Sequence, residues 1–158
     1  MSTKTIILLF IGVFTTLCAN PITSPMTTPL IASGTFDIKV QPCEDSEFQA
    51  GRLTIDKIYY GSLAGTGKGQ MLSVRTANPG SAGYVAMELV EATLDGKTGS
   101  FALQHTGLMS RGESSLTVVI VPDSGTGELK GIAGAMTIDQ SSGGHRFELS
   151  YTIEPSAK

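Results

Sequence analysis

The sequence predicts an all-β protein that folds as an eight-stranded antiparallel up-and-down barrel. About eight short apolar runs recur at intervals of roughly 10 to 14 residues and are joined by short turns, many of them rich in glycine. No run of useful length has the periodicity of a helix. Glycines also lie inside the predicted strands, which favours a barrel because a closing sheet must bend sharply.

The N-terminus has the layout of a secretory signal peptide. Lys4 supplies a positive charge, residues 6–17 are apolar or small, and Cys18 and Ala19 are small. Twelve apolar residues are too few to span a bilayer core, which needs ~20. We therefore predict that residues 1–19 are a signal peptide and that the mature protein is secreted or periplasmic. A lipid anchor at Cys18 is the alternative, but Leu17 is larger than the small residue expected before an acylated cysteine.

One domain is expected after the leader. Residues 20–31 are rich in Pro, Thr and Ser and predict a flexible tether, and residues 32–155 predict a single β-barrel domain. A chain of 158 residues with 41% hydrophobic content can bury one core. Cleavage after Ala19 would leave one cysteine, Cys43, so no internal disulfide would support the fold.

Charge and composition argue against nucleic acid as a partner. Removing residues 1–19 takes away Lys4 and no acid, which leaves 10 basic and 14 acidic residues in the mature chain. The sequence has no tryptophan, 6% aromatic residues and no basic cluster. Single-stranded nucleic acid is usually bound by stacked rings above a positive groove.

The predicted strands are 32–40, 51–60, 64–76, 83–94, 97–107, 114–121, 128–139 and 144–153. In 51–60 both faces carry apolar residues, so the pattern leaves open which face is the core. Leu53, Ile55, Lys57 and Tyr59 lie on one face, and Ile58 and Tyr60 lie on the other.

Asp95-Gly96 is the strongest hairpin signal in the chain. A two-residue type I′ turn needs positive φ at both positions, which Asp-Gly tolerates. Leu94 then pairs with Lys97, and counting back places Glu88 opposite Leu103 and Ala86 opposite His105. Glu88 and His105 therefore become diagonal neighbours on one face.

This face carries the candidate ligand-binding residues, and Glu88 and His105 are the candidate catalytic residues. A carboxylate in an apolar lumen can act as a general acid or base, or bind the polar end of a ligand. We expect burial to raise the pKa of Glu88. The alternative is a structural carboxylate held by His105, Arg75 or a tyrosine hydroxyl. The predicted binding row consists of Tyr84, Glu88, Val90, Phe101, Leu103 and His105.

Other motifs favour structural explanations. Residues 65–69 resemble a phosphate-binding loop, but Ser62 stands where its first glycine belongs and Gly69 where its Ser or Thr belongs. Ser124 and Thr126 lie in a glycine turn without an orienting base, so we interpret them as turn residues. His145 is the only other histidine, so no metal is expected, and no cofactor is indicated.

The face opposite Glu88 is also apolar in the central hairpin. Val85, Met87 and Leu89 lie there, which predicts that part of the outer wall is covered. The commonest cover is another copy of the chain, so a homo-oligomer is expected.

Several motifs together resemble a bacterial family of unknown function. They are residues 99–107, the SGTGEL segment 124–129 with Gly131 and Gly134, and the FELSY segment 147–151. Members of this family resemble small barrels with the calycin-like fold of plant allene oxide cyclase. The resemblance runs from about residue 34 to 153 and implies an eight-stranded barrel and an oligomer, but no activity. The leader and Asp123, where a glycine is usual, depart from the family pattern.

Three functions remain open at this point. The first is an exported barrel that binds one small, mainly apolar ligand in its lumen. The second is an enzyme of the cyclase or isomerase kind, in which Glu88 and His105 move a proton or stabilise charge. The third is a filled barrel that acts through protein contacts alone.

Overall fold

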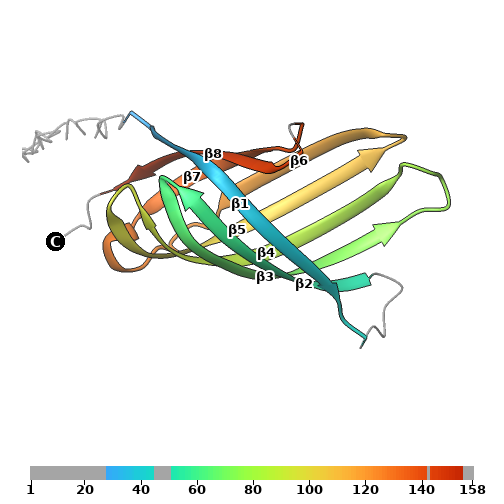
Figure 1. The fold of residues 1–158 in the computed structure, drawn as a ribbon, viewed down its shortest axis with the longest axis horizontal. Coiled ribbons are helices and arrows are strands. Elements are labelled where there is room, and N and C mark those ends of the chain that lie inside the picture. Colours follow the sequence, from blue (N-terminus) through green and yellow to red (C-terminus); the bar gives the residue numbers. More distant parts are fainter. Residues whose placement is uncertain (1–27, 45–50, 142, 155–158) are drawn as a thin grey trace, which may run out of the picture.

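A computed structural model describes residues 28–44, 51–141 and 143–154. In this part, eight antiparallel strands form a closed barrel in which each strand pairs with the next and the last pairs with the first (Figure 1). The predicted all-β barrel is therefore confirmed. The strands are β1 (Leu30–Pro42), β2 (Gly51–Gly61), β3 (Leu63–Arg75), β4 (Ala82–Leu94), β5 (Lys97–Ser110), β6 (Glu113–Ile120), β7 (Ile132–Asp139) and β8 (His145–Ile153).

The central hairpin has the predicted register. Leu94 pairs with Lys97, Glu88 with Leu103 and Ala86 with His105. Asp95 and Gly96 both have positive φ, at 46° and 84°, as a type I′ turn requires. The short turn thus fixes which residues of β4 and β5 face the lumen.

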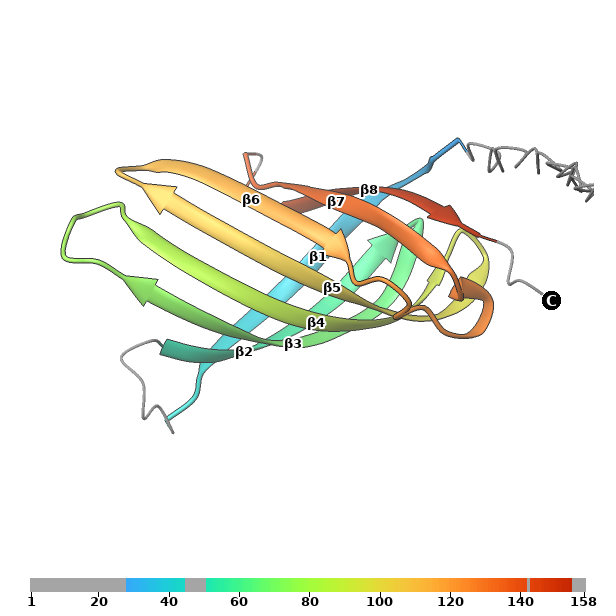
Figure 2. The same cartoon turned by 180° about the vertical axis from the view of Figure 1, so that it is seen from behind.

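The two ends of the barrel differ. The β3–β4 and β5–β6 hairpins extend at one end, and the β2–β3, β4–β5 and β6–β7 connections lie at the other (Figures 1 and 2). At the second end, Leu63, Leu94 and Leu129 have no exposed surface. The Tyr151 hydroxyl there donates a hydrogen bond to Asp95 Oδ2 at 2.8 Å. We call this the closed end and the opposite one the mouth.

The β6–β7 connection corrects one predicted strand. Residues 128–131 were expected to belong to the strand 128–139, but β7 begins at Ile132 and a 3₁₀ turn, η1 (Gly127–Leu129), precedes it. Gly127 and Gly131 have φ of 57° and 80°, a left-handed conformation that breaks an extended strand. Asp123, also in this connection, has φ of 61°, which explains why a glycine would suit that position.

Side chains from this connection take the place of a strand beside the first half of β5. Ser124 Oγ accepts a hydrogen bond from the Ala102 amide at 3.0 Å, and Thr126 Oγ1 accepts one from the Ser100 amide at 3.1 Å. The Glu128 carboxylate accepts one from the Thr98 amide at 2.8 Å. The edge of β5 is therefore satisfied without a continuous β6.

β6 and β7 pair weakly. Between their described residues, two pairs form the seam, Val118 with Met136 and Val119 with Ala135. By contrast, β4 and β5 pair along their whole lengths. Toward the mouth, residues 113–117 of β6 and 137–139 of β7 therefore have one unpaired side each, and the two strands separate there (Figure 2).

The remaining sequence predictions concern the termini. The signal peptide 1–19, with its cleavage site and Cys18, lies outside the described residues, and so does most of the tether. β1 begins at Leu30, two residues before the predicted start of the domain. The described residues contain no helix that is long and apolar enough to cross a membrane.

Candidate functional site

A cluster of buried polar side chains surrounds Glu88 halfway along the lumen. Glu88 is 1% exposed, and Lys57 and His105 are each 4% exposed. Lys57 Nζ donates to Glu88 Oε2 at 2.7 Å, and the Tyr59 hydroxyl donates to Glu88 Oε1 at 2.7 Å. His105 Nε2 lies 3.0 Å from Glu88 Oε2. Glu88 and His105 thus meet inside the barrel as predicted, but within a group of four side chains.

Aromatic rings complete the surroundings of Lys57. Its ammonium lies 4.5 Å from the centre of the Phe36 ring and 3.2 Å from the Tyr59 hydroxyl oxygen. The Tyr59 ring packs edge-on against Phe147, with 5.6 Å between ring centres. The ammonium is therefore held by one carboxylate, one hydroxyl and the faces of two rings, since it also lies 5.5 Å from the centre of the Tyr59 ring.

Three glycines of β3 make room for this cluster. β3 places glycine at three successive lumenal positions, 65, 67 and 69, which pair with Tyr59, Lys57 and Ile55 of β2. A Cβ at Gly67 would lie 2.0 Å from Glu88 Oε1 and 3.0 Å from the Tyr59 ring. The segment that resembles a phosphate-binding loop is thus strand, and its lack of side chains leaves space for β2 and β4 to contact across it.

The predicted direction of the Glu88 pKa is wrong. Burial pushes this pKa up, but hydrogen bonds from His105, Lys57 and Tyr59 and the charge of Lys57 outweigh it, so the pKa lies below its ordinary value of 4.5. Burial and the adjacent carboxylate also raise the pKa of Tyr59. Glu88 is therefore ionised at neutral pH, while Tyr59 keeps its proton.

Sequence reasoning missed Lys57. It named a tyrosine hydroxyl as a possible partner of Glu88 without identifying Tyr59, and it also named Arg75. Arg75 instead ends β3 and is exposed. The sequence of β2 has apolar residues on both faces, so the pattern did not show whether Lys57 points into the lumen or outward. The sequence signal that could have found Lys57 is the glycine at every second position of 65–69. Where a strand has no side chains on its lumenal face, large side chains of neighbouring strands must fill the space.

The six residues of the predicted binding row lie at different depths of the lumen. Val90, Phe101 and Leu103 have no exposed surface and pack in the core. Leu103 pairs with Glu88, and Val90 pairs with Phe101 on its closed side. Tyr84 lies on the mouth side, and burial raises the pKa of its hydroxyl. Tyr84 is the one member of the row that lines the cavity at the mouth.

The mouth cavity has a volume of about 540 Å³. It extends to the separated ends of β6 and β7 and has a mainly apolar lining. Contributing residues include Leu53, Met71, Tyr84, Gly107, Leu116 and Ile138. Gly107 lies one lumenal position after His105, toward the mouth. A Cβ at Gly107 would lie 2.1 Å from the Tyr84 ring, so this ring covers Gly107 at the cavity floor. The polar cluster begins one residue pair below.

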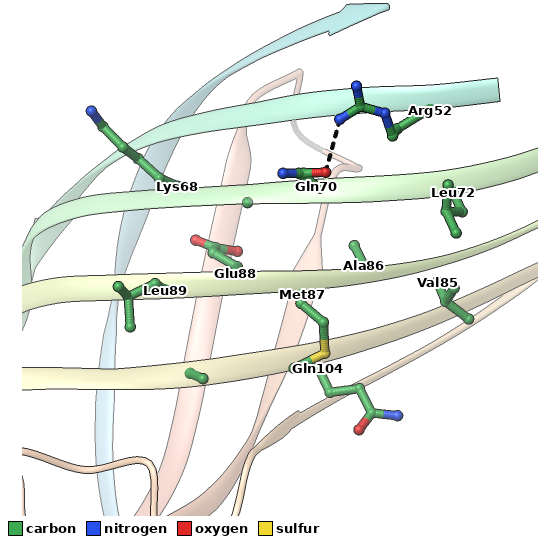
Figure 3. A pocket seen from close by; sticks show the side chains of 12 residues that line it. Arg52, Lys68, Gln70, Leu72, Val85, Ala86, Met87, Glu88, Leu89 and Gln104 are labelled. Carbon is green, nitrogen blue, oxygen red and sulfur yellow. Dashed lines mark hydrogen bonds between the residues drawn. The ribbon is translucent and has the colours of Figure 1, made fainter. Parts of the chain in front are cut away.

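A second hollow lies on the outer wall and has a volume of about 860 Å³ (Figure 3). Outward side chains of β3 and β4 border it, among them Leu72, Met87 and Leu89, and Arg52 donates a hydrogen bond to Gln70 at 3.0 Å on its rim. The carboxylate of Glu88 points away from this hollow into the lumen, where its three partners are. The hollow is thus a surface groove on the apolar outer face.

The described residues give no support for a metal site or for Ser124 as a nucleophile. Among them, no group of three or more His, Cys, Asp or Glu side chains lies close enough to hold a metal ion. The Ser124 hydroxyl donates to the Val121 carbonyl at 2.6 Å, in addition to its bond with the Ala102 amide. Ser124 therefore serves the backbone of the β6–β7 connection.

The fold and its sequence match a known family. The profile of a family described as "Protein of unknown function (DUF3224)" matches residues 32–151, which is most of the barrel. The chain belongs to the DUF3224 family. The predicted resemblance to a bacterial family of unknown function is therefore confirmed.

One solved structure of a DUF3224 protein is similar to this chain. It is described as the crystal structure of a protein with unknown function from the DUF3224 family of Shewanella oneidensis MR-1. The two chains are 42% identical, the match covers 81% of this chain and 99% of that one, and the TM-score is 0.77. A comparison with curated proteins found no match.

Proposed function

We propose that this DUF3224 protein binds one small, mainly apolar molecule in the mouth of its barrel. The observation that carries the proposal is the cavity of about 540 Å³ with Leu53, Met71 and Ile138 in its wall. Ligand pockets of proteins typically measure about 300 to 1,000 Å³ and are lined mainly by apolar side chains with a few polar groups. The polar cluster just below the floor supplies such groups.

Binding is better supported than proton transfer. A general base works best with a pKa near the operating pH, but three hydrogen bonds and the Lys57 charge keep the pKa of Glu88 below its ordinary value. Its oxygens are also already occupied by protein donors. A cyclase or isomerase activity, and the narrower likeness to allene oxide cyclase, stay predictions.

Native mass spectrometry of protein taken directly from its host tests the binding proposal. We expect one retained small molecule per chain. Leu53→Trp should expel it, because the larger ring fills the mouth cavity, whereas Leu72→Trp, on the outer face, should leave it bound. The proposal would be contradicted if the wild-type protein and both variants all carried no bound molecule, even after an apolar molecule had been added.

We also propose that the protein is exported, on the basis of Lys4, the apolar run 6–17 and the small residues that follow it. N-terminal sequencing of the cellular protein should find Asn20 first. A lipid on Cys18 would indicate lipoprotein processing instead, and an N-terminus at Met1 or Ser2 would exclude both.

A further inference from the structure

We infer that His105 Nδ1 is the polar contact for the ligand, and that the site selects an apolar molecule that carries a hydrogen-bond donor, such as an alcohol. This inference rests on the proposed binding function and adds the chemical class of the ligand. It follows from the bonds of Glu88, the surface of the imidazole ring, and the position of His105 below the mouth.

The bonds of Glu88 assign the two ring nitrogens. An ionised carboxylate accepts hydrogen bonds and donates none, so the 3.0 Å contact between His105 Nε2 and Glu88 Oε2 requires a proton on Nε2. The charges of Lys57 and Glu88 compensate each other at 2.7 Å. In a neutral imidazole that carries its proton on Nε2, the free lone pair lies on Nδ1. Nδ1 is therefore an acceptor.

Nδ1 lacks a protein partner. Among the residues that the structure describes, none forms a hydrogen bond with it, while the Nε2 contact with Glu88 is present. No fully buried side-chain nitrogen or oxygen in the described part of the chain lacks a partner. The side chain of His105 as a whole is 6% exposed. A nearly buried acceptor of this kind favours a donor that approaches through the lumen.

The proposed route to that acceptor leads from the mouth cavity, whose lining ends at the pair of Tyr84 and Gly107, one lumenal pair from His105. Ala86, which pairs with His105, and Gly107, the next lumenal residue of β5, are both small. Gly107 lines the cavity beside Tyr84. A ligand whose apolar body contacts Leu53, Met71 and Ile138 can thus direct its polar end past Tyr84 to His105.

Two probes of equal chain length test the inference, 1-decanol and decyl methyl ether. Both are apolar, but the ether has no donor. The wild-type protein is titrated with each at neutral pH, and the imidazole ¹⁵N signals and the methyl signals of Leu53 and Ile138 are recorded. The chain has two histidines, and a His145→Gln variant assigns the signals, so His145 serves as an internal control.

We expect 1-decanol to bind at least tenfold more tightly and to move the Nδ1 signal of His105 in the direction of a new hydrogen bond, while the ether moves the methyl signals alone. Equal affinities with an unchanged Nδ1 signal, or an Nδ1 already bonded to a retained water, would overturn the role of His105 and leave the binding function standing. Failure of both probes to move the Leu53 and Ile138 methyl signals would overturn the binding function as well.

Discussion

At the scale of single residues, Glu88 holds the lumenal cluster together. Its carboxylate accepts hydrogen bonds from three side chains on two strands, β5 beside β4 and β2 on the far side of β3. The carboxylate also compensates the positive charge of the buried Lys57 ammonium. Breaking such a buried pair from one side is strongly destabilising, because the remaining ion stays desolvated.

Glu88→Gln should therefore lower the free energy of unfolding by ~3 to 5 kcal/mol, the usual cost of leaving one buried partner unpaired. Urea unfolding at pH 7 measures this. Glu91→Gln is the matched control, because Glu91 lies on the same strand but is exposed on the outer face, where substitutions usually change stability by less than ~0.5 kcal/mol. Equal stabilities of the two variants would contradict a supporting role of Glu88.

The low pKa of Glu88 also predicts the pH dependence of stability. A carboxyl whose pKa is lower in the folded than in the unfolded chain stabilises the fold above its unfolded value, and this contribution is lost as the pH falls below about 4.5 through the folded value. Urea midpoints measured from pH 7 to pH 3 should fall more steeply for the wild type than for Glu88→Gln. A parallel decline would show that other carboxyls cause the acid sensitivity.

Gly67 is the second residue on which the cluster depends. Gly67→Ala should destabilise the protein by at least ~1 to 3 kcal/mol, because the new Cβ occupies the space of Glu88 Oε1. Gly144→Ala, where a Cβ has no atom within 4 Å, should change stability by less than ~0.5 kcal/mol. Thermal melts of both variants compare the two positions, and a stable Gly67→Ala protein would mean that the carboxylate can move.

At the scale of strands, the seam between β6 and β7 is the weak part of the barrel. Two residue pairs join these strands among the described residues, whereas β4 is paired along its length on both sides. The same separation opens the wall of the mouth cavity, since Leu116 and Ile138 line it from the two strands. The loosest strand pair and the proposed binding site therefore coincide.

Amide hydrogen exchange should reveal this seam. In residues 113–117 and 137–139, the amides that point into the gap lack a backbone acceptor and should exchange much faster than those of β4. The measurement is residue-resolved exchange monitored by NMR at neutral pH. Protection equal to that of β4 would show that the two strands pair fully in solution.

At the scale of the whole molecule, the outer wall has two different sides. Over β3 and β4 it carries Leu72, Val74, Val85, Met87 and Leu89, each about half exposed. Over β1 and β8 the outward residues include Asp37, Lys39, Arg146 and Glu148. We propose that a second copy of the chain covers the apolar side, since apolar patches of this kind commonly mark contact surfaces.

Met87→Lys should then shift the protein toward monomers, because burying an unpaired ammonium in the contact is unfavourable. Thr35→Lys, on the polar side of the barrel, should leave the association state unchanged. Sedimentation velocity of the wild type and both variants distinguishes these outcomes. A wild-type protein that is monomeric at all concentrations would refute self-association through this face.

Much of the fold was determined by local sequence patterns. Alternating apolar residues and glycine turns predicted the eight strands, and Asp95-Gly96 alone fixed the register that places Glu88 and His105 on one face, because a two-residue turn leaves no freedom in the count. The missed strand start near residue 128 has a local cause too, since Gly127 and Gly131 are left-handed. Glycine allows the left-handed conformation but does not require it, so the sequence alone did not show that the strand begins later.

The composition of the candidate site was decided by the tertiary structure. Lys57 and Tyr59 are 31 and 29 residues away from Glu88 and reach it across β3, which has glycine at three successive lumenal positions, 65, 67 and 69. The pKa of Glu88 depends on the sum of burial and of every neighbouring charge and donor. Its direction is therefore the reverse of the predicted one, because the hydrogen bond from His105 is joined by the charge and hydrogen bond of Lys57, which was not foreseen, and by the hydroxyl of Tyr59. Pattern reasoning places a side chain on a face, but barrel closure determines which side chains from distant strands share its surroundings.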